Sequence, residues 1–359
     1  MTCRVLIVDD SSTTRTMLRR YLGDDPELEI VGAAPNGREA IDRLERYNPD
    51  VVLLDVEMPV LNGLETLPEL LKLRPKLPVI MFSRLTDRGA AETIDALFLG
   101  AADYVLKPDS GAAFQECIAH ELIPKLRACG GIVAAESSDR SPVPAEPLNK
   151  PDSIVSRTPG KEASTRVEIL VIASSTGGPK ALVELIQLLP VEMPVPTVIV
   201  QHMPPDFTTA LAQRLDSLSP LTVREASSDQ AVSAADVWLA AGNHHLVVHR
   251  GASGVRVQLN SGPPENSCRP AADVLFRSVA EEYGAGTLAV VLTGMGNDGL
   301  AGCGRIVERG GSVIVQDEAS SAVWGMPGQV AKAGLAEAIL PIEELGREIS
   351  TRLARRRSS

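Results

Sequence analysis

The sequence predicts an α/β protein built from two doubly wound parallel-sheet domains joined by a flexible linker. In both halves, short apolar runs rich in β-branched residues alternate with amphipathic segments of helical period. From residue 129 to about 165 this periodicity disappears, and Pro, Ser, Glu and Asp predominate within 134–161. The length of 359 residues also exceeds that of one ordinary domain. We therefore expect one domain at 3–127, a linker at 128–165 and a second domain at 166–354.

The composition excludes several classes of function. A net charge of -11 opposes non-specific binding to nucleic acid, and only 3% of the residues are aromatic. No apolar run reaches the roughly 20 residues that a membrane-spanning helix needs. The five cysteines show no C-x-x-C spacing, so the sequence indicates neither a zinc site nor a disulfide framework. We expect a cytoplasmic protein with no nucleic-acid partner and no direct membrane insertion.

The first domain carries its polar groups where its expected strands end. The strands are expected at residues 5–8, 29–32, 51–54, 79–82 and 104–106. The side chains that close four of them are Asp9 with Asp10, Asp55, Ser83 and Lys107. The carboxyl ends of parallel strands share one edge of a sheet, so these groups should converge.

Three carboxylates in one crevice repel each other and favour a bound cation, and hard oxygen ligands suit Mg²⁺. With Lys107 and the Ser83 hydroxyl nearby, such a crevice can accept a phosphoryl group on one aspartate. An acidic pair in a solvated loop is the alternative reading of Asp9 and Asp10 taken alone. Five suitable residues at successive strand ends favour the phosphoryl site.

These residues resemble the receiver domains of two-component response regulators, which have a flavodoxin-like fold. The resemblance implies that Asp55 is the phosphoacceptor and that a histidine kinase is the phosphodonor. It implies a Mg²⁺ site formed by Asp9, Asp10, Asp55 and the backbone carbonyl of Glu57. It also implies that Ser83 and Tyr104, with Lys107, form the switch that responds to phosphorylation.

The second domain opens with a strand expected at 167–173, a turn through Gly177 and a helix that continues the apolar pattern. Ser175 lies in this turn, at the carboxyl end of a strand and beside the free N–H groups of a helix start, where an anion is stabilised. Ser175 is therefore a candidate nucleophile. Ser174, Ser175 and Thr176 could instead be ordinary helix-capping residues.

Two further strand ends favour the nucleophile. A strand expected at 195–200 leads to His202, and one at 287–292 leads to a glycine-rich turn that contains Asp298. A serine, a histidine and an aspartate that meet at one sheet edge can form a hydrolytic triad. Asp317, after the strand expected at 312–316, is the alternative acid. The backbone N–H groups of the flanking turns are the expected oxyanion donors: Thr176, Gly177, Met295 and Gly296.

The segments 175–179, 201–205, 269–270 and 292–299 resemble those of the catalytic domain of the chemotaxis methylesterase (CheB) family, whose fold is Rossmann-like. The resemblance implies a catalytic set of Ser175, His202 and Asp298, with Mg²⁺ needed in the receiver and no cofactor for the esterase chemistry. It implies a phosphorylation-activated serine hydrolase that demethylates glutamate γ-methyl esters on methyl-accepting chemoreceptors and deamidates receptor glutamines. One departure is Ala173-Ser174, where the family pattern has glycine followed by a small residue.

Two rival hypotheses remain at this stage. The chain could be a binding protein, in which a receiver is attached to an inert α/β domain; an intact set of Ser175, His202 and Asp298 argues against this. Alternatively, the hydrolase could serve a receptor system other than flagellar chemotaxis, and the residues do not distinguish between such systems.

Overall fold

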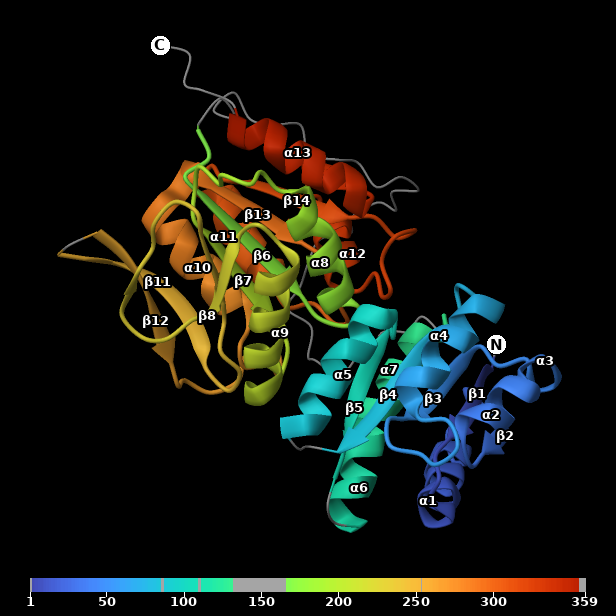
Figure 1. Cartoon of the computed structure of the whole chain (residues 1–359). Helices are drawn as coiled ribbons and strands as arrows, with labels where there is room; N and C mark the ends of the chain where they lie inside the picture. The colour runs from blue at the N-terminus through green and yellow to red at the C-terminus, as the bar shows by residue number, and fades with distance from the viewer. Residues whose placement is uncertain (1, 85–86, 109–110, 132–165, 253, 355–359) are drawn as a thin grey trace, which may run out of the picture. The chain divides into compact units, whose positions relative to one another are not determined.

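The computed structural model describes residues 2–84, 87–108, 111–131, 166–252 and 254–354 (Figure 1). Most of the expected linker, from 132 to 165, lies outside the described residues. The elements of the first half, in chain order, are β1 Cys3–Val8, α1 Ser12–Gly23, β2 Leu28–Ala34, α2 Gly37–Asp42, α3 Leu44–Tyr47, β3 Val51–Asp55, α4 Gly63–Leu73, β4 Val79–Arg84, α5 Asp87–Leu99, β5 Asp103–Lys107, α6 Gly111–Cys117, the π-helical turn η1 Ile118–Leu122 and α7 Ile123–Cys129.

The described strands of the first half form one five-stranded sheet in the order β2-β1-β3-β4-β5. The neighbouring pairs around β1 and β3 are parallel, and β3 is buried along its whole length. A strand buried on both faces explains why the sequence shows continuous apolar runs instead of alternation. Because β1 lies between β2 and β3, the chain order reverses there, and the carboxyl ends of β1 and β3 border a switch point where ligands bind in such folds.

The elements of the second half are β6 Ile169–Ser174, α8 Gly178–Leu188, β7 Thr197–Gln201, α9 Pro205–Leu218, β8 Thr222–Glu225, β9 Gln230–Ala231, β10 Asp236–Leu239, β11 His245–Gly251, β12 Gly254–Asn260, α10 Ala272–Tyr283, η2 Gly284–Gly286, β13 Thr287–Val291, α11 Leu300–Glu308, β14 Ser312–Gln316, α12 Met326–Lys332, β15 Ala338–Leu340 and α13 Ile342–Ala354. Seven of these strands form a parallel sheet in the order β15-β14-β13-β6-β7-β10-β8. Strands β9, β11 and β12 form a separate antiparallel sheet.

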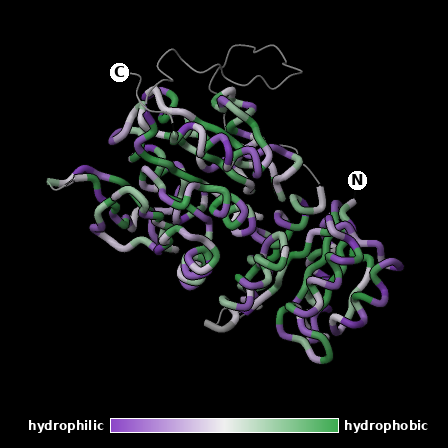
Figure 2. Tube along the Cα trace, turned by 45° about the horizontal axis from the view of Figure 1, so that its top comes forward, coloured by the Kyte–Doolittle hydropathy of each residue, from purple (hydrophilic) through white to green (hydrophobic). Residues whose placement is uncertain are grey.

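The second sheet is covered on both sides by helices. Helix α8 contacts both α9 and α13 in one layer, and α10 and α11 pack together in another (Figure 1). The core beneath α10 combines Leu275 and Phe276 with strand residues such as Val171 and Val291, all fully buried. Figure 2 shows hydrophobic stretches alternating with hydrophilic ones along the chain trace. The predicted fold class, two parallel-sheet domains, is confirmed; the small antiparallel sheet was not predicted.

Candidate functional site

Three carboxylates gather at the carboxyl edge of the first sheet. The last residues of β1 pair with those of β3, so Asp9 and Asp55 leave neighbouring strands at the same level. Carboxylate oxygens of Asp9, Asp10 and Asp55 lie within 4.8 Å of one another. At the end of β5, the Nζ atom of Lys107 lies 2.8 Å from Oδ2 of Asp9 and 2.6 Å from Oδ2 of Asp55. The sheet thus brings these four predicted residues into one cluster.

The electrostatics of this cluster favour a bound cation. Asp9 and Asp55 are almost fully buried. Burial raises the pKa of Asp55 to about 6; Lys107 opposes this rise, whereas Asp9 and Asp10 add to it. One lysine does not balance three carboxylates, and the clustered hard oxygens match the ligands that Mg²⁺ takes in proteins. The acidic cluster is therefore typical of a Mg²⁺ site.

The remaining predicted residues of this domain lie around the cluster. Ser83 follows Phe82, the partner of Asp55 in the β3–β4 pairing, and its hydroxyl donates to the carbonyl of Arg84 at 3.3 Å. Tyr104 lies in β5. Glu57 follows Asp55 by two residues with its side chain exposed, and that carboxylate is not part of the cluster.

Sequence reasoning missed Arg15. Its Nη1 atom donates to the backbone carbonyl of Asp9 at 2.6 Å and to that of Asp10 at 2.8 Å. Arg15 thereby holds the backbone of the acidic pair from the first turn of α1. The signal available in the sequence was an arginine that follows two adjacent acids by five and six residues.

In the second domain, strand register brings the predicted serine and histidine to one level. Ser174 pairs with Gln201 across β6 and β7, so Ser175 and His202 follow side by side. The backbone N–H of His202 donates to Ser174 O at 3.1 Å, and the N–H of Ser175 donates to the carbonyl of Thr293 at 3.1 Å. These backbone hydrogen bonds therefore connect the turns after β6, β7 and β13 next to Ser175.

His202 and Asp298 form a buried pair. Nε2 of His202 lies 2.7 Å from Oδ2 of Asp298, with the two side chains 11% and 2% exposed. Asp298 also accepts hydrogen bonds from the backbone N–H of Ala272 at 2.6 Å and of Asp273 at 3.1 Å. Asp298 therefore caps α10, whose own N-cap residue makes no side-chain hydrogen bond. The alternative acid, Asp317, instead accepts from the backbone and hydroxyl of Ser320 in its own turn.

The pKa values of Asp298 and His202 shift in opposite directions, and each shift favours the charged form. Burial by itself would raise the pKa of Asp298, but hydrogen bonds from His202 and from the start of α10 hold it below the usual value. Burial would lower the pKa of His202, but the interactions with Asp298 and Cys268 together outweigh burial and raise it. The carboxylate thus stabilises a positive charge on the imidazole ring, as a base that accepts a proton requires.

Ser175 itself makes no side-chain hydrogen bond within the part of the chain that the structure describes. The second ring nitrogen of His202, Nδ1, lies 3.5 Å from Sγ of Cys268. Since Asp298 engages Nε2, Nδ1 is the ring atom left to serve a nucleophile. Sequence reasoning missed Cys268, because its only local signal was its position before Arg269-Pro270.

The backbone around Ser175 is closely fitted. The side chain of Gln201 accepts from the Ser174 hydroxyl at 2.7 Å and donates to the Ser175 carbonyl at 2.9 Å. A side chain on Gly294 would meet the Met326 sulfur and the Ser175 Cβ, so only glycine fits there. Ala173 is fully buried within β6, which accommodates the departure from the family pattern.

The predicted oxyanion donors remain available. The N–H groups of Thr176, Gly177, Met295 and Gly296 donate to no other backbone carbonyl in the turns that the structure describes. By contrast, the N–H of Ser175 is engaged by Thr293. A substrate carbonyl beside Ser175 could therefore accept hydrogen bonds from the four predicted positions.

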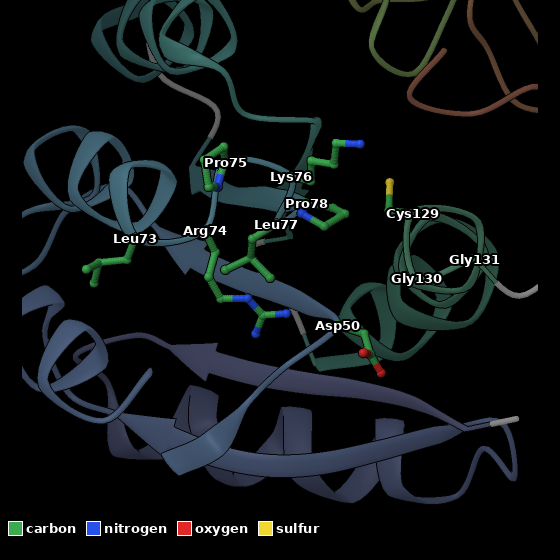
Figure 3. Close-up of a pocket in the computed structure, with 10 residues that line it drawn as sticks. All are labelled: Asp50, Leu73, Arg74, Pro75, Lys76, Leu77, Pro78, Cys129, Gly130 and Gly131. Atoms are coloured by element: carbon green, nitrogen blue, oxygen red, sulfur yellow. The ribbon is translucent and has the colours of Figure 1, made fainter. Parts of the chain in front are cut away.

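A pocket of about 590 Å³ lies at the opposite edge of the first sheet, before β3 and β4 (Figure 3). Its polar lining includes Asp50, Arg74 and Lys76. The Arg74 guanidinium is already engaged by Asn48 and by the carbonyl of Pro49. This pocket contains none of the predicted site residues.

Comparison with known proteins agrees with this division. Residues 170–349 match the family model described as CheB methylesterase, and residues 5–119 match that of the response regulator receiver domain. Proteins named protein-glutamate methylesterase/protein-glutamine glutaminase are similar over nearly the full length. The one from Trichodesmium erythraeum is 46% identical, covering 98% of this chain and 99% of its own. The one from a Nocardioides species is 47% identical, covering 99% and 97%. The crystal structure of the Thermotoga maritima CheB methylesterase catalytic domain is 41% identical with a TM-score of 0.51, covering 52% of this chain and 99% of its own.

Proposed function

Because the chain belongs to the CheB methylesterase family and carries a response regulator receiver domain, we propose that it is a protein-glutamate methylesterase and protein-glutamine glutaminase activated by phosphorylation. The observation that carries the proposal is the buried His202–Asp298 pair at the strand ends beside Ser175. In the framework of this proposal, the domains are 3–127 and 166–354, joined by a linker at 128–165.

The proposed chemistry assigns a role to each residue of the set. The Ser175 hydroxyl attacks the γ-carbonyl of a glutamate methyl ester while Nδ1 of His202 takes its proton, and Asp298 stabilises the imidazolium through Nε2. The N–H groups at Thr176 or Gly177 and at Met295 or Gly296 bind the oxyanion. Collapse of the tetrahedral intermediate breaks the ester C–O bond, and His202 protonates the departing methanol. Water, deprotonated by His202, then releases the glutamate carboxylate from Ser175. With a glutamine substrate, the same steps release ammonia.

This reaction requires the Ser175 hydroxyl to replace the Cys268 thiol as the partner of Nδ1. A thiol is a weak hydrogen-bond donor, so its displacement costs little. Catalytic hydrogen bonds are often long or absent before substrate binds. That the described residues include no hydrogen bond between the Ser175 hydroxyl and His202 is therefore compatible with the proposed roles.

The receiver domain supplies the control. Asp55 is the proposed phosphoacceptor, and Asp9, Asp10, Asp55 and the carbonyl of Glu57 would hold Mg²⁺. Bound there, Mg²⁺ would neutralise phosphoryl oxygens as they reach Asp55. Lys107, already 2.6 Å from Asp55, would contact the phosphoryl group, and Ser83 and Tyr104 would respond to it.

The proposed partners follow from the family. The substrates are glutamate methyl esters and glutamines on methyl-accepting chemoreceptors, the phosphodonor is a chemotaxis histidine kinase, and the outcome is chemotactic adaptation. The protein would act in the cytoplasm. Among the described helices, none combines the length and apolarity needed to cross a membrane.

The test is methanol release from methylated receptor membranes by the wild type, Ser175→Ala and Asp55→Asn, each with and without a small phosphodonor and Mg²⁺. We expect release that requires Ser175 and that rises with phosphodonor only when Asp55 is present. Release by Ser175→Ala at the wild-type rate would refute the hydrolase mechanism. Stimulation of Asp55→Asn equal to that of the wild type would refute the proposed control.

A further inference from the structure

A short turn at residues 265–268 lies directly against the His202–Asp298 pair. Glu265 and Cys268 exchange backbone hydrogen bonds of 3.1 and 2.9 Å. The two central residues, Asn266 and Ser267, have φ values of 51° and 62°. Two left-handed residues that are not glycine are uncommon, and such conformations persist where the surroundings fix them. The turn therefore has a defined structure that its neighbours maintain.

The turn is anchored to α10. The carboxylate of Glu265 forms two hydrogen bonds of 2.6 Å with the guanidinium of Arg277. Two parallel bonds of this kind fix orientation as well as distance. The backbone N–H groups at the start of α10 also bind Asp298. The same helix therefore fixes the positions of both the turn and the acid.

The side chain of Asn266 joins two buried carboxylates. Its Nδ2 atom donates to Oδ1 of Asp298 at 3.0 Å and to Oδ2 of Asp273 at 2.9 Å. The two acids are 2% and 3% exposed. The other oxygen of Asp273 accepts from the backbone N–H of Gly302 at 2.6 Å. A primary amide carries two hydrogens on one nitrogen, so Asn266 can satisfy both acids at once.

Few other side chains could replace this amide. Aspartate has no donor when ionised, and a hydroxyl has one hydrogen for two acceptors. Two buried carboxylates without intervening donors favour sharing a proton, because like charges disfavour the doubly ionised state. A shared proton would remove the negative charge that His202 needs. The bridge therefore protects the ionised form of Asp298.

We propose that Asn266 is a positioning residue of the esterase, whose amide orients Asp298 toward His202 and keeps Asp298 and Asp273 both ionised. This inference rests on the proposed function, in which His202 is the base. It adds a fourth residue that acts through Asp298 without contacting the substrate. The other titratable groups acting on the two acids are His202, Glu265, Arg277 and Cys303.

The test compares Asn266→Ala, Asn266→Asp and Asn266→Gln in the full-length chain. We expect the first two to lower kcat by about 10- to 100-fold with KM nearly unchanged, the same order as the loss when hydrogen-bond partners of metal ligands are removed. Each removes the donor that lies between Asp298 and Asp273, so the two acids share a proton and His202 loses part of the negative charge beside it. The pKa of His202 then falls, and the ascending limb of kcat/KM should move to lower pH in both variants. Asn266→Gln keeps the amide and should recover part of the activity.

The matched control is Asn260→Ala. Asn260 is the exposed last residue of β12, and within the described part of the chain its side chain accepts from the N–H of Gly262. We expect wild-type kcat and an unmoved pH profile. A uniform loss of kcat in Asn266→Ala, with the ascending limb unchanged, would overturn the proposal in favour of a purely structural role.

A second measurement does not depend on activity. The chain has five histidines, so the ring signals of His202 can be identified by NMR with selectively labelled histidine and a His202→Gln reference. We expect the titration of His202 to move to lower pH in Asn266→Ala and to stay in place in Asn260→Ala. An unmoved titration of His202 in Asn266→Ala would refute the positioning role. Activity retained by Ser175→Ala would refute the proposed function instead, so the two failures are distinguishable.

Discussion

Replacing Asp298 by asparagine tests the proposed acid with an almost unchanged shape. The carboxylate accepts four hydrogen bonds: from His202 and Ala272 on Oδ2, and from Asp273 and Asn266 on Oδ1. Asparagine keeps one acceptor oxygen, so in either orientation its NH₂ group faces two donors. The negative charge 2.7 Å from the imidazole is lost in both cases.

The expected cost can be bounded. A hydrogen bond to a charged group contributes about 1.5–3 kcal/mol, and leaving buried donors unpaired costs about 1–3 kcal/mol more. A loss of about 3–5 kcal/mol of transition-state stabilisation corresponds to a decrease in kcat of about 10²- to 10⁴-fold. A serine protease loses a factor of about 10⁴ on the corresponding substitution.

The direction in which the pH profile shifts gives a second test of Asp298→Asn, independent of the size of the loss in kcat. The hydrogen bond with Asp298 raises the pKa of His202, and the base must be neutral to act, so kcat/KM should rise as pH increases through that value. In Asp298→Asn the pKa of His202 falls, and the ascending limb should move to lower pH. The assay is methanol release measured across pH with the wild type and the variant.

Asp317→Asn is the matched control, because it removes a carboxylate at the end of the neighbouring strand β14 that does not contact His202. We expect its kcat to stay within about threefold of the wild type, as the residue lies outside the hydrogen-bonded pair. The reasoning is refuted if Asp298→Asn, folded by circular dichroism, keeps kcat within about threefold, or if Asp317→Asn carries the larger loss.

Three further predictions concern other parts of the molecule. Gly294→Ala should lower the free energy of unfolding by about 1–3 kcal/mol, because the added methyl group meets buried neighbours; in urea titrations Gly304→Ala, whose methyl group meets nothing within 4 Å in α11, should be stabilising by comparison. Alkylation of the wild type with iodoacetamide should abolish methanol release because Cys268 lies 3.5 Å from His202, whereas Cys268→Ala should keep its activity under the same treatment; equal inactivation would contradict this assignment. Chelation of Mg²⁺ should remove the stimulation by phosphodonor while leaving basal methanol release unchanged, and Asp10→Asn should need more Mg²⁺ for the same stimulation; a fall in basal release would place a metal in the esterase reaction.

Much of the candidate site could be predicted because parallel sheets convert strand order into proximity. Ser175, His202 and Asp298 each follow a continuous apolar run, and the registers of β6 with β7 and β13 place those strand ends together. The same reasoning applies to Asp9 and Asp55. Periodicity alone was sufficient to identify these strands.

The residues that the sequence did not reveal lie where no period exists. Asn266 and Cys268 reach the pair through a turn whose path depends on the packing of α10 and on the Glu265–Arg277 contact. The guanidinium of Arg269 is likewise engaged by the Gly262 carbonyl and the Asn243 side chain. Such contacts arise from tertiary structure and leave little trace in local patterns.

The capping of α10 by Asp298 has a consequence for reading related sequences. The carboxylate terminates a helix that lacks a cap of its own, so selection for a stable fold retains an acceptor at this position whether or not the chain hydrolyses anything. The Ser175 hydroxyl makes no hydrogen bond in the described structure, so selection for a stable fold does not require a serine there. In descendants that lost catalysis, the serine should therefore drift first and the aspartate persist. Presence of the acid alone is weak evidence of an active enzyme, whereas presence of the serine is strong evidence.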